Sequence, residues 1–340
     1  MFAACESTHR VEANSRHNRW QAGDPITQPA PLWTATIESD VVGPPVVHGD
    51  VFVASRDAVT RLSVGDGSQV WRVEVPCTGA PTWFNGRVVV GTAKGVVALD
   101  ATSGETLWET ALDGAVTSSS TVSTTLFVPT FRGEFVSISE DGGVNWRART
   151  AGAIAGSPAV DDDSIAAASA DGFLYVLDRQ TGELRWKWEA PRGLDTSPTL
   201  TDTQVLLGVA DGSVLAFDSK TGKLNWSNPT RSAVVSTPLV AAELVVVATI
   251  DGQLLAVNAR TGAVQWEQQI DAGMWFGPVG RGDSLVSVAG AQLQGRQVST
   301  GKQDWAIDLA AEIRYAPVIA DALVVVVAGT QVVALQAPKP

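Results

Sequence analysis

The stretch "ADGSVLAFDSKTGKLNW", from Ala210 to Trp226, is typical of two tight turns, each followed by a strand. Its Asp211-Gly212 pair suits the turn of a β-hairpin, because glycine adopts positive φ without steric cost. In the second turn the carboxylate of Asp218 can accept hydrogen bonds from its own backbone, and Gly222 tolerates left-handed φ. Carboxylates at this position are therefore predicted to be structural. The outline recurs in three other stretches: "LDATSGETLWE" (Leu99–Glu109), "LDRQTGELRWKWE" (Leu177–Glu189) and "VNARTGAVQWE" (Val257–Glu267).

Two series of residues keep one phase along the chain. The first is a set of eight tryptophans spaced 37 to 40 residues apart: Trp33, Trp71, Trp108, Trp146, Trp186, Trp226, Trp266 and Trp305. The second is a proline, replaced once by serine, that follows each tryptophan by 12 residues or, once, by 10: Pro45, Pro81, Ser120, Pro158, Pro198, Pro238, Pro278 and Pro317. A repeat of about 40 residues is typical of four-stranded propeller blades.

One repeat, Ser197 to Trp226, contains four apolar runs of strand length, each bounded by turn residues. The chain is therefore predicted to be all-β, an eight-bladed β-propeller of four-stranded antiparallel blades. After Pro317 the sequence reaches Pro340 without a tryptophan strand, whereas Trp33 has no preceding strands of its own. We expect the strand "PLWTATI" (Pro31–Ile37) to complete the eighth blade and so close the ring.

The domain organisation follows from the same pattern. Residues 32–340 are predicted to form a single propeller. Residues 1–31 are polar, contain proline and have no periodic apolar pattern, so we expect a disordered N-terminal tether.

Composition excludes several classes of function. The 36 acidic and 24 basic residues give a formal charge of −12, which repels nucleic acid. The three histidines are His9, His17 and His48, and seven of the eight repeats contain none, so histidine-based triads and zinc clusters have almost no residues to draw on. Apolar runs such as Leu323–Ala328 are too short to span a membrane, and we expect a soluble chain without a transmembrane helix.

The two cysteines lie in different settings. Cys77 is predicted to be a lone, partly buried thiol. Cys5 ends the segment "MFAAC", which resembles the end of a bacterial lipoprotein signal, so Cys5 is a candidate lipidation site. The basic start and apolar stretch of such a signal do not precede it in this sequence, so either the coding start is truncated or the match is chance.

The repeat "ADGSVLAFDSKTGKLNW" resembles the PQQ-type propeller repeat with its tryptophan-docking motif, and the resemblance covers about residues 32–337. Blade number, size and the early cysteine resemble BamB-like outer-membrane assembly lipoproteins. This resemblance implies a ring in the cell envelope that binds a barrel-assembly partner. Two alternatives stay open: a quinoprotein dehydrogenase that holds pyrroloquinoline quinone with calcium, and a sensor or scaffold ectodomain. The dehydrogenases carry an adjacent cysteine pair and are much longer, and this chain departs from both features.

The loops that lead from a tryptophan strand to the next blade are the candidate partner-binding sites, because variable loops on a rigid scaffold usually carry recognition. They contain aromatic, methionine and arginine side chains of the kinds enriched at protein interfaces. The candidates are Trp188, Arg192, Gly193, Leu194 and Asp195 in the fourth loop, Met274, Trp275 and Phe276 in the sixth, and Arg314 and Tyr315 in the seventh. In BamB-like proteins an Arg-Gly pair in a corresponding loop contributes to partner binding, and Arg192-Gly193 matches that pair.

Each candidate has a simpler interpretation. Trp275 and Phe276 could plug the channel or pack between blades, and Arg192 could pair with Asp195. The acidic run from Asp161 to Asp163 is more typical of a hydrated turn than of a calcium loop, and Trp83 is more typical of core than of a cofactor stack.

From these observations we expect a non-catalytic, monomeric propeller of the bacterial cell envelope. It would lie in the periplasm or another extracytoplasmic compartment, with a lipid on Cys5 as its possible membrane contact. We expect a protein partner at one loop face, and no cofactor, metal ion or nucleic acid.

Overall fold

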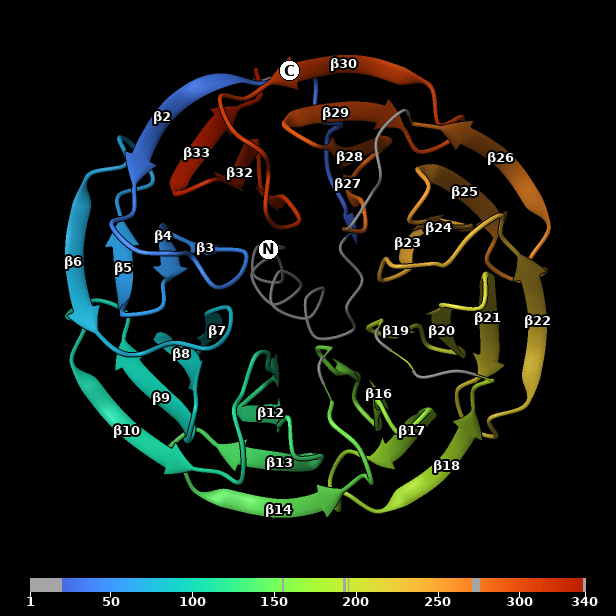
Figure 1. Cartoon of the computed structure of the whole chain (residues 1–340), viewed down its shortest axis with the longest axis horizontal. Coiled ribbons are helices and arrows are strands. Elements are labelled where there is room, and N and C mark those ends of the chain that lie inside the picture. The colour runs from blue at the N-terminus through green and yellow to red at the C-terminus, as the bar shows by residue number, and fades with distance from the viewer. Residues whose placement is uncertain (1–19, 155, 192–193, 195, 271–275, 339–340) are drawn as a thin grey trace, which may run out of the picture.

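Eight β-sheets stand around a central axis in the computed structural model, which describes residues 20–154, 156–191, 194, 196–270 and 276–338. Figure 1 shows these sheets as the blades of a closed ring, each running from the channel to the rim. The predicted fold class is therefore confirmed. Within the described residues, no helix is long and apolar enough to cross a membrane.

Each blade is built from four strands in chain order, with the last blade as the exception. The innermost strands are β3 (Val46–His48), β7 (Thr82–Phe84), β11 (Ser120–Val122), β15 (Ala159–Val160), β19 (Thr199–Leu200), β23 (Leu239–Ala241), β27 (Val279–Arg281) and β31 (Val318–Ala320). The second strands are β4 (Asp50–Ala54), β8 (Arg87–Thr92), β12 (Thr125–Pro129), β16 (Ser164–Ala168), β20 (Gln204–Val209), β24 (Leu244–Ala248), β28 (Ser284–Ala289) and β32 (Leu323–Ala328).

The outer half of each blade carries the tryptophan. The third strands are β5 (Ala58–Leu62), β9 (Gly95–Asp100), β13 (Glu134–Ser139), β17 (Phe173–Asp178), β21 (Ser213–Asp218), β25 (Gln253–Asn258), β29 (Gln292–Gln297) and β33 (Gln331–Gln336). The outermost strands are β6 (Gln69–Glu74), β10 (Thr106–Ala111), β14 (Val144–Arg149), β18 (Leu184–Glu189), β22 (Leu224–Pro229), β26 (Val264–Gln269), β30 (Gln303–Asp308) and, in the eighth blade, β2 (Ala30–Thr36).

The ring closes through the two ends of the propeller sequence, as predicted. β2 pairs antiparallel with β33, from Ala30 opposite Gln336 to Thr36 opposite Gln331. In Figure 1 the blue β2 lies beside the red β33. The eighth blade therefore takes its outer strand from the start of the chain and its other three strands from the end.

Each series tryptophan joins its blade to the next one. The indole nitrogen donates a hydrogen bond to a backbone carbonyl across the boundary: Trp33 to Val64 (2.8 Å), Trp71 to Ala101 (3.2 Å), Trp108 to Glu140 (2.9 Å), Trp146 to Arg179 (3.1 Å), Trp186 to Ser219 (2.9 Å), Trp226 to Ala259 (2.9 Å), Trp266 to Val298 (2.8 Å) and Trp305 to Ile26 (2.9 Å). The rings also bury apolar area between the sheets, which stabilises neighbouring blades together.

The turn that receives the indole explains the recurring "D-x-x-T-G". The carboxylate of Asp218 accepts hydrogen bonds from the backbone N–H groups of Lys220 and Thr221. Gly222 has φ +70°, and a Cβ there would lie 2.7 Å from the ring of Trp186. The acidic residue therefore shapes the turn, as predicted, and the glycine gives the tryptophan room.

The N-terminal segment differs from the predicted tether. Residues 20–31 lie against the seventh and eighth blades, where β1 (Trp20–Gln21) pairs in parallel with the innermost strand β27 as a fifth strand. Ile26 is buried, and its carbonyl is the acceptor for Trp305. The reason is geometric: no third-to-fourth-strand turn exists in the eighth blade, so this segment supplies the carbonyl that such a turn supplies elsewhere. Residues 1–19, including Cys5, lie outside the described residues.

Candidate functional site

The connections between blades lie on one face of the ring, which we call the loop face. It carries the segments from each outermost strand to the next innermost strand, together with the turns between second and third strands. Isolated bridges join these two kinds of segment, at Cys77 with Thr92, Val234 with Thr249 and Ile313 with Ala328. These three loops are therefore fixed to the blade edges by backbone pairing.

In the fourth loop the described candidates are less accessible than expected. Trp188 belongs to β18, and its ring packs 5.1 Å from the ring of Phe217 in the next blade. Leu194 is 3% exposed within the same apolar cluster. These two side chains hold the fourth and fifth blades together and offer little surface to a partner. Arg192, Gly193 and Asp195 lie outside the described residues, so the proposed pairing of Arg192 with Asp195 stays a prediction.

The sixth and seventh loops bring predicted residues together. The ring of Phe276 lies 6.4 Å from the ring of Tyr315, and the hydroxyl of Tyr315 donates a 2.7 Å hydrogen bond to the carbonyl of Val41. Burial raises the pKa of Tyr315, so the phenol is neutral and donates this bond over the ordinary pH range. Met274 and Trp275 lie outside the described residues.

A chain of charges continues the same cluster into the first blade. Arg314 lies 3.5 Å from one carboxylate oxygen of Asp40, and Arg56 lies 3.4 Å from the other. The side chain of Arg314 is 46% exposed. Phe276, Tyr315, Arg314, Asp40 and Arg56 thus form a continuous set of contacts across three blade boundaries, and we call it the closure cluster.

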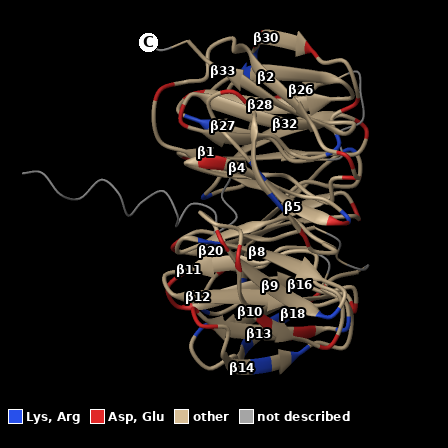
Figure 2. Cartoon of the chain, turned by 90° about the vertical axis from the view of Figure 1, so that its left-hand side faces the viewer, with Lys and Arg blue, Asp and Glu red and all other residues tan. Residues whose placement is uncertain are grey.

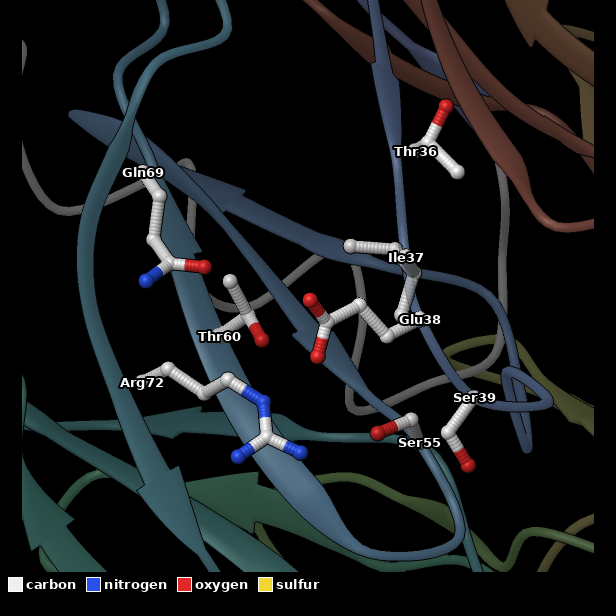
Figure 3. Close-up of a pocket in the computed structure, with 8 residues that line it drawn as sticks. All are labelled: Thr36, Ile37, Glu38, Ser39, Ser55, Thr60, Gln69 and Arg72. Atoms are coloured by element: carbon white, nitrogen blue, oxygen red, sulfur yellow. The ribbon is translucent and has the colours of Figure 1, made fainter.

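A small polar pocket lies beside the closure cluster, between the eighth and first blades. Its lining comes from the end of β2 and from the first blade: Thr36, Ile37, Glu38, Ser39, Ser55, Thr60, Gln69 and Arg72. Figure 3 shows Glu38, Gln69 and Arg72 directed into this space. Its volume of about 70 Å³ is far below the roughly 300–1,000 Å³ of ordinary small-molecule sites.

The charged groups at this pocket are largely engaged with one another. Arg72 lies 2.6 Å from a carboxylate oxygen of Asp57. The hydroxyl of Ser55 donates a 2.8 Å hydrogen bond to Asp57 and is the main cause that lowers the pKa of that carboxyl. The pocket can hold water or a small polar group, and its geometry indicates no acid–base pair set for catalysis.

An aromatic pair joins the innermost strands of the first and second blades, β3 and β7. Trp83 stacks on His48 with ring centroids 3.9 Å apart, and it also lies 5.9 Å from Phe52 of the first-blade core. Trp83 is partly buried against that core, as predicted. In the acidic run, Asp161 accepts hydrogen bonds from the backbone N–H groups of Asp163 and Ser164, as expected of a turn.

The residues present fit a quinone and its calcium ion poorly. The sequence has two cysteines, Cys5 and Cys77, and therefore no adjacent pair. Cys77 is a buried free thiol. Throughout the described residues, no three His, Cys, Asp or Glu side chains are grouped so that they could hold a metal ion.

Sequence reasoning missed one exposed group on the loop face, at the turn of the third blade. Phe131 is 47% exposed there and precedes Arg132, which shares the carboxylate of Asp113 with Arg149. The signal was present in the repeat, because this turn carries Asp-Gly in three other blades and Arg-Gly here.

Comparisons with known proteins agree with the architecture. A family model described as outer membrane protein assembly factor BamB matches residues 26–115, 55–136, 93–216 and 175–275. The structure is similar to that of BamB from Moraxella catarrhalis, with 19% identity, a TM-score of 0.77, and coverage of 91% of this chain and 100% of that one. Among curated protein sequences, none matches this chain significantly.

Two further solved structures show how widely this fold is used. The computationally designed Ika8 protein has 16% identity and a TM-score of 0.80, over 91% of this chain and 100% of its own. The quinohemoprotein alcohol dehydrogenase ADHIIG from Pseudomonas putida HK5 has 13% identity and a TM-score of 0.80, over 96% of this chain and 80% of its own. At these identities the likeness shows the fold alone, so function has to be argued from the site.

Proposed function

Because the chain belongs to the PQQ-repeat family described as outer membrane protein assembly factor BamB, we propose that it is a non-catalytic propeller of the bacterial cell envelope. It binds a protein partner through its loop face, and the partner is a component of the machinery that assembles outer-membrane barrels. A lipid on Cys5 would tether the ring to the membrane.

The observation that carries this proposal is the closure cluster. It places an aromatic pair, Phe276 and Tyr315, next to a half-exposed arginine, Arg314. Aromatic and arginine side chains held by a rigid scaffold are the usual anchors of protein interfaces. The hydrogen bond from Tyr315 to Val41 fixes the cluster before any partner arrives, so little entropy is lost on binding.

Cofactor chemistry is left out of the proposal for a specific reason. The described pocket is small and polar, and its arginine is already paired with Asp57. The sequence offers no adjacent cysteines to a quinone. The proposal therefore assigns the ring to binding alone.

A pull-down with purified barrel-assembly components from the same organism tests the partner. The double variant Phe276→Ala/Arg314→Ala removes one aromatic ring and the half-exposed arginine of the closure cluster, and we expect at least about a tenfold loss of binding. The control is Val264→Ser, which changes a side chain that is 51% exposed on the rim and should leave binding unchanged. If the original chain, the double variant and the Val264→Ser control all bind equally well, the closure cluster is not part of the interface. A separate variant, Arg192→Ala, tests the predicted Arg-Gly contact.

A titration tests the non-catalytic part of the proposal. Purified chain is mixed with pyrroloquinoline quinone and calcium, and cofactor absorbance is followed. We expect no saturable change. Tight stoichiometric binding would contradict the proposal and favour a quinoprotein.

A further inference from the structure

The turn between the second and third strands allows the blades to be compared within one molecule. In the fourth, fifth and sixth blades its glycine follows an aspartate, at Asp171, Asp211 and Asp251. In the second and third blades the same position holds Lys94 and Arg132. In the third to sixth blades the turn glycines Gly133, Gly172, Gly212 and Gly252 take φ between +73° and +90°, so these turns share one backbone conformation while the charge before the glycine is reversed in the third blade. The second-blade turn also carries a basic residue, but its Gly95 has φ +144° and its backbone differs.

The third-blade turn also holds an aromatic side chain out in solvent. Phe131 is 47% exposed, whereas its backbone N–H donates a 3.0 Å hydrogen bond to the carbonyl of Ala115. The turn is closed by a 2.9 Å bond from the N–H of Thr130 to Glu134, and Gly133 takes φ +73°. Phe131 therefore projects from a fixed backbone.

Ion pairs fix three arginines of the same blade, one of which follows Phe131 in the chain. Arg132 and Arg149 lie 3.0 and 3.2 Å from the two carboxylate oxygens of Asp113. Arg147 lies 2.7 Å from Glu134, which is buried and also accepts a 3.0 Å hydrogen bond from the N–H of Asp113. Figure 2 shows basic residues, in blue, on β14, the strand of Arg147 and Arg149.

The charge of this group is opposite to that of the whole chain. Three guanidinium groups pair with two carboxylates. The exposed Lys94 stands on the neighbouring second-blade turn, and its backbone carbonyl accepts a 2.9 Å bond from Leu112, the residue before Asp113. The side chains of Arg132 and Arg149 are 72% and 63% exposed. They keep donors directed to solvent, since each arginine has five N–H groups.

We propose that Phe131, Arg132 and Arg149, here called the blade-three patch, bind an acidic, extended segment of a partner protein that also carries an apolar side chain. The arginines pair with carboxylates, for which guanidinium geometry is suited, and the apolar side chain packs on the fixed ring of Phe131. This surface lies on different blades from the closure cluster, so the proposal goes beyond the function proposed above and does not depend on it.

The rest of the loop face argues for a short acidic segment over nucleic acid. A polyanion that ran on from the blade-three patch over the fourth, fifth and sixth blades would meet Asp171, Asp211 and Asp251. These carboxylates would repel the phosphates of a nucleic acid, and the net charge of −12 adds to the repulsion. An acidic protein segment of a few residues can bind the blade-three patch without reaching these aspartates.

The test measures binding of a fluorescein-labelled peptide, Glu-Asp-Leu-Glu-Phe-Asp-Leu-Glu, to the full chain by anisotropy. The variant Phe131→Ala/Arg132→Asp rebuilds the Ala-Asp-Gly turn that the fourth and fifth blades already accommodate, so the fold has a precedent for it. The matched control is Ile250→Ala, which removes a 38% exposed apolar residue from the same turn on the acidic side.

We expect saturable binding that weakens at least about tenfold in the double variant and by less than about twofold in Ile250→Ala. Raising salt from about 0.05 to about 0.5 M should also weaken binding, because exposed ion pairs are screened. Circular dichroism and urea midpoints confirm that the variants are folded, and Arg132→Ala takes the place of the double variant if that chain is unfolded.

Three results would overturn the proposal. The peptide shows no saturable binding, the blade-three variants bind it as well as the original chain, or Ile250→Ala loses as much affinity as they do. Stronger binding of a peptide with lysine at each acidic position, or of a single-stranded oligonucleotide, would equally reject an acidic protein segment as the ligand. A failed pull-down with barrel-assembly components has no bearing on these outcomes.

Discussion

Replacing Ile26 tests whether the N-terminal segment is part of the propeller. The side chain of Ile26 is 3% exposed and belongs to the apolar cluster between the seventh and eighth blades. Its carbonyl accepts hydrogen bonds from the indole of Trp305 at 2.9 Å and from the hydroxyl of Ser284 at 3.3 Å. Ile26→Ala keeps this carbonyl, so the variant isolates the contribution of the buried side chain.

The expected loss can be worked out from the atoms removed. Three buried carbon groups at about 0.8 kcal/mol each give about 2.4 kcal/mol of lost transfer free energy. The cavity that remains adds to this, and substitutions of this type cost about 2 to 5 kcal/mol. We therefore expect the free energy of unfolding to fall by about 3 kcal/mol.

The assay is equilibrium unfolding in urea, followed by far-ultraviolet circular dichroism. The matched control is Thr27→Ala, which changes the exposed neighbouring residue and should alter the free energy by less than about 0.5 kcal/mol. If Ile26→Ala unfolds at the same urea concentration as the original chain, the packing of residues 20–31 contributes nothing and the segment is a tether after all.

Three further measurements address other parts of the fold. Burial is the main cause that raises the pKa of Cys77 to about 12. In the variant Cys5→Ser, a thiol reagent at pH 8 should therefore leave Cys77 unlabelled until urea unfolds the chain. Rapid labelling of the folded chain would contradict this. A hydrogen bond from Arg185 is the main cause that lowers the pKa of Asp178 to about 2. Because the pKa of Asp178 is lower in the folded than in the unfolded chain, its charge stabilises the fold above pH 4, and this stabilisation is lost as the pH falls toward 2. Asp178→Asn should therefore lower the free energy of unfolding by about 1 kcal/mol at pH 7 and by almost nothing at pH 2. A loss that does not depend on pH would refute this explanation. Trp186→Phe keeps a ring but loses the donor to the next blade, so urea unfolding should show a loss of at least about 1 kcal/mol, and an unchanged midpoint would show that the indole bond is dispensable.

The ring could be predicted from the sequence because several independent features of the repeat indicate the same fold. Local rules for turns, the spacing of Trp186 and its counterparts, and the incomplete eighth repeat all pointed to the same architecture. The closing strand at Trp33 followed from the need to avoid an unpaired sheet edge. None of these inferences required knowledge of which side chains meet across a boundary.

Burial within the loops was harder to predict, and Trp188 illustrates why. We placed it in a loop, but it lies two residues after Trp186 in β18, and alternate residues of a strand point to the same face. Both rings therefore face the next blade, where Phe217 lies. Attention to the period of the strand would have corrected this from sequence alone.

The N-terminal segment was missed for a different physical reason. Its strand β1 has two residues, Trp20 and Gln21, which is too short for any periodic pattern. The available signal was indirect: Trp305 belongs to the series and needs a carbonyl in the next blade, yet that blade has no turn to provide one. The blade-three patch was not predicted because it stands on a turn within a blade, whereas variable loops between blades are the usual place for recognition.

The closed eighth blade also has a mechanical consequence. Since β2 and β33 run antiparallel, Ala30 and Gln336 lie side by side at one end of the pair. Tension applied at those two points would break the hydrogen bonds one after another, as a zipper opens. The contact of Ile26 with Trp305 intercepts such tension and passes it into the seventh blade first. A force applied at the start of the chain would therefore reach the β2–β33 pair only after the contact between Ile26 and Trp305 had broken.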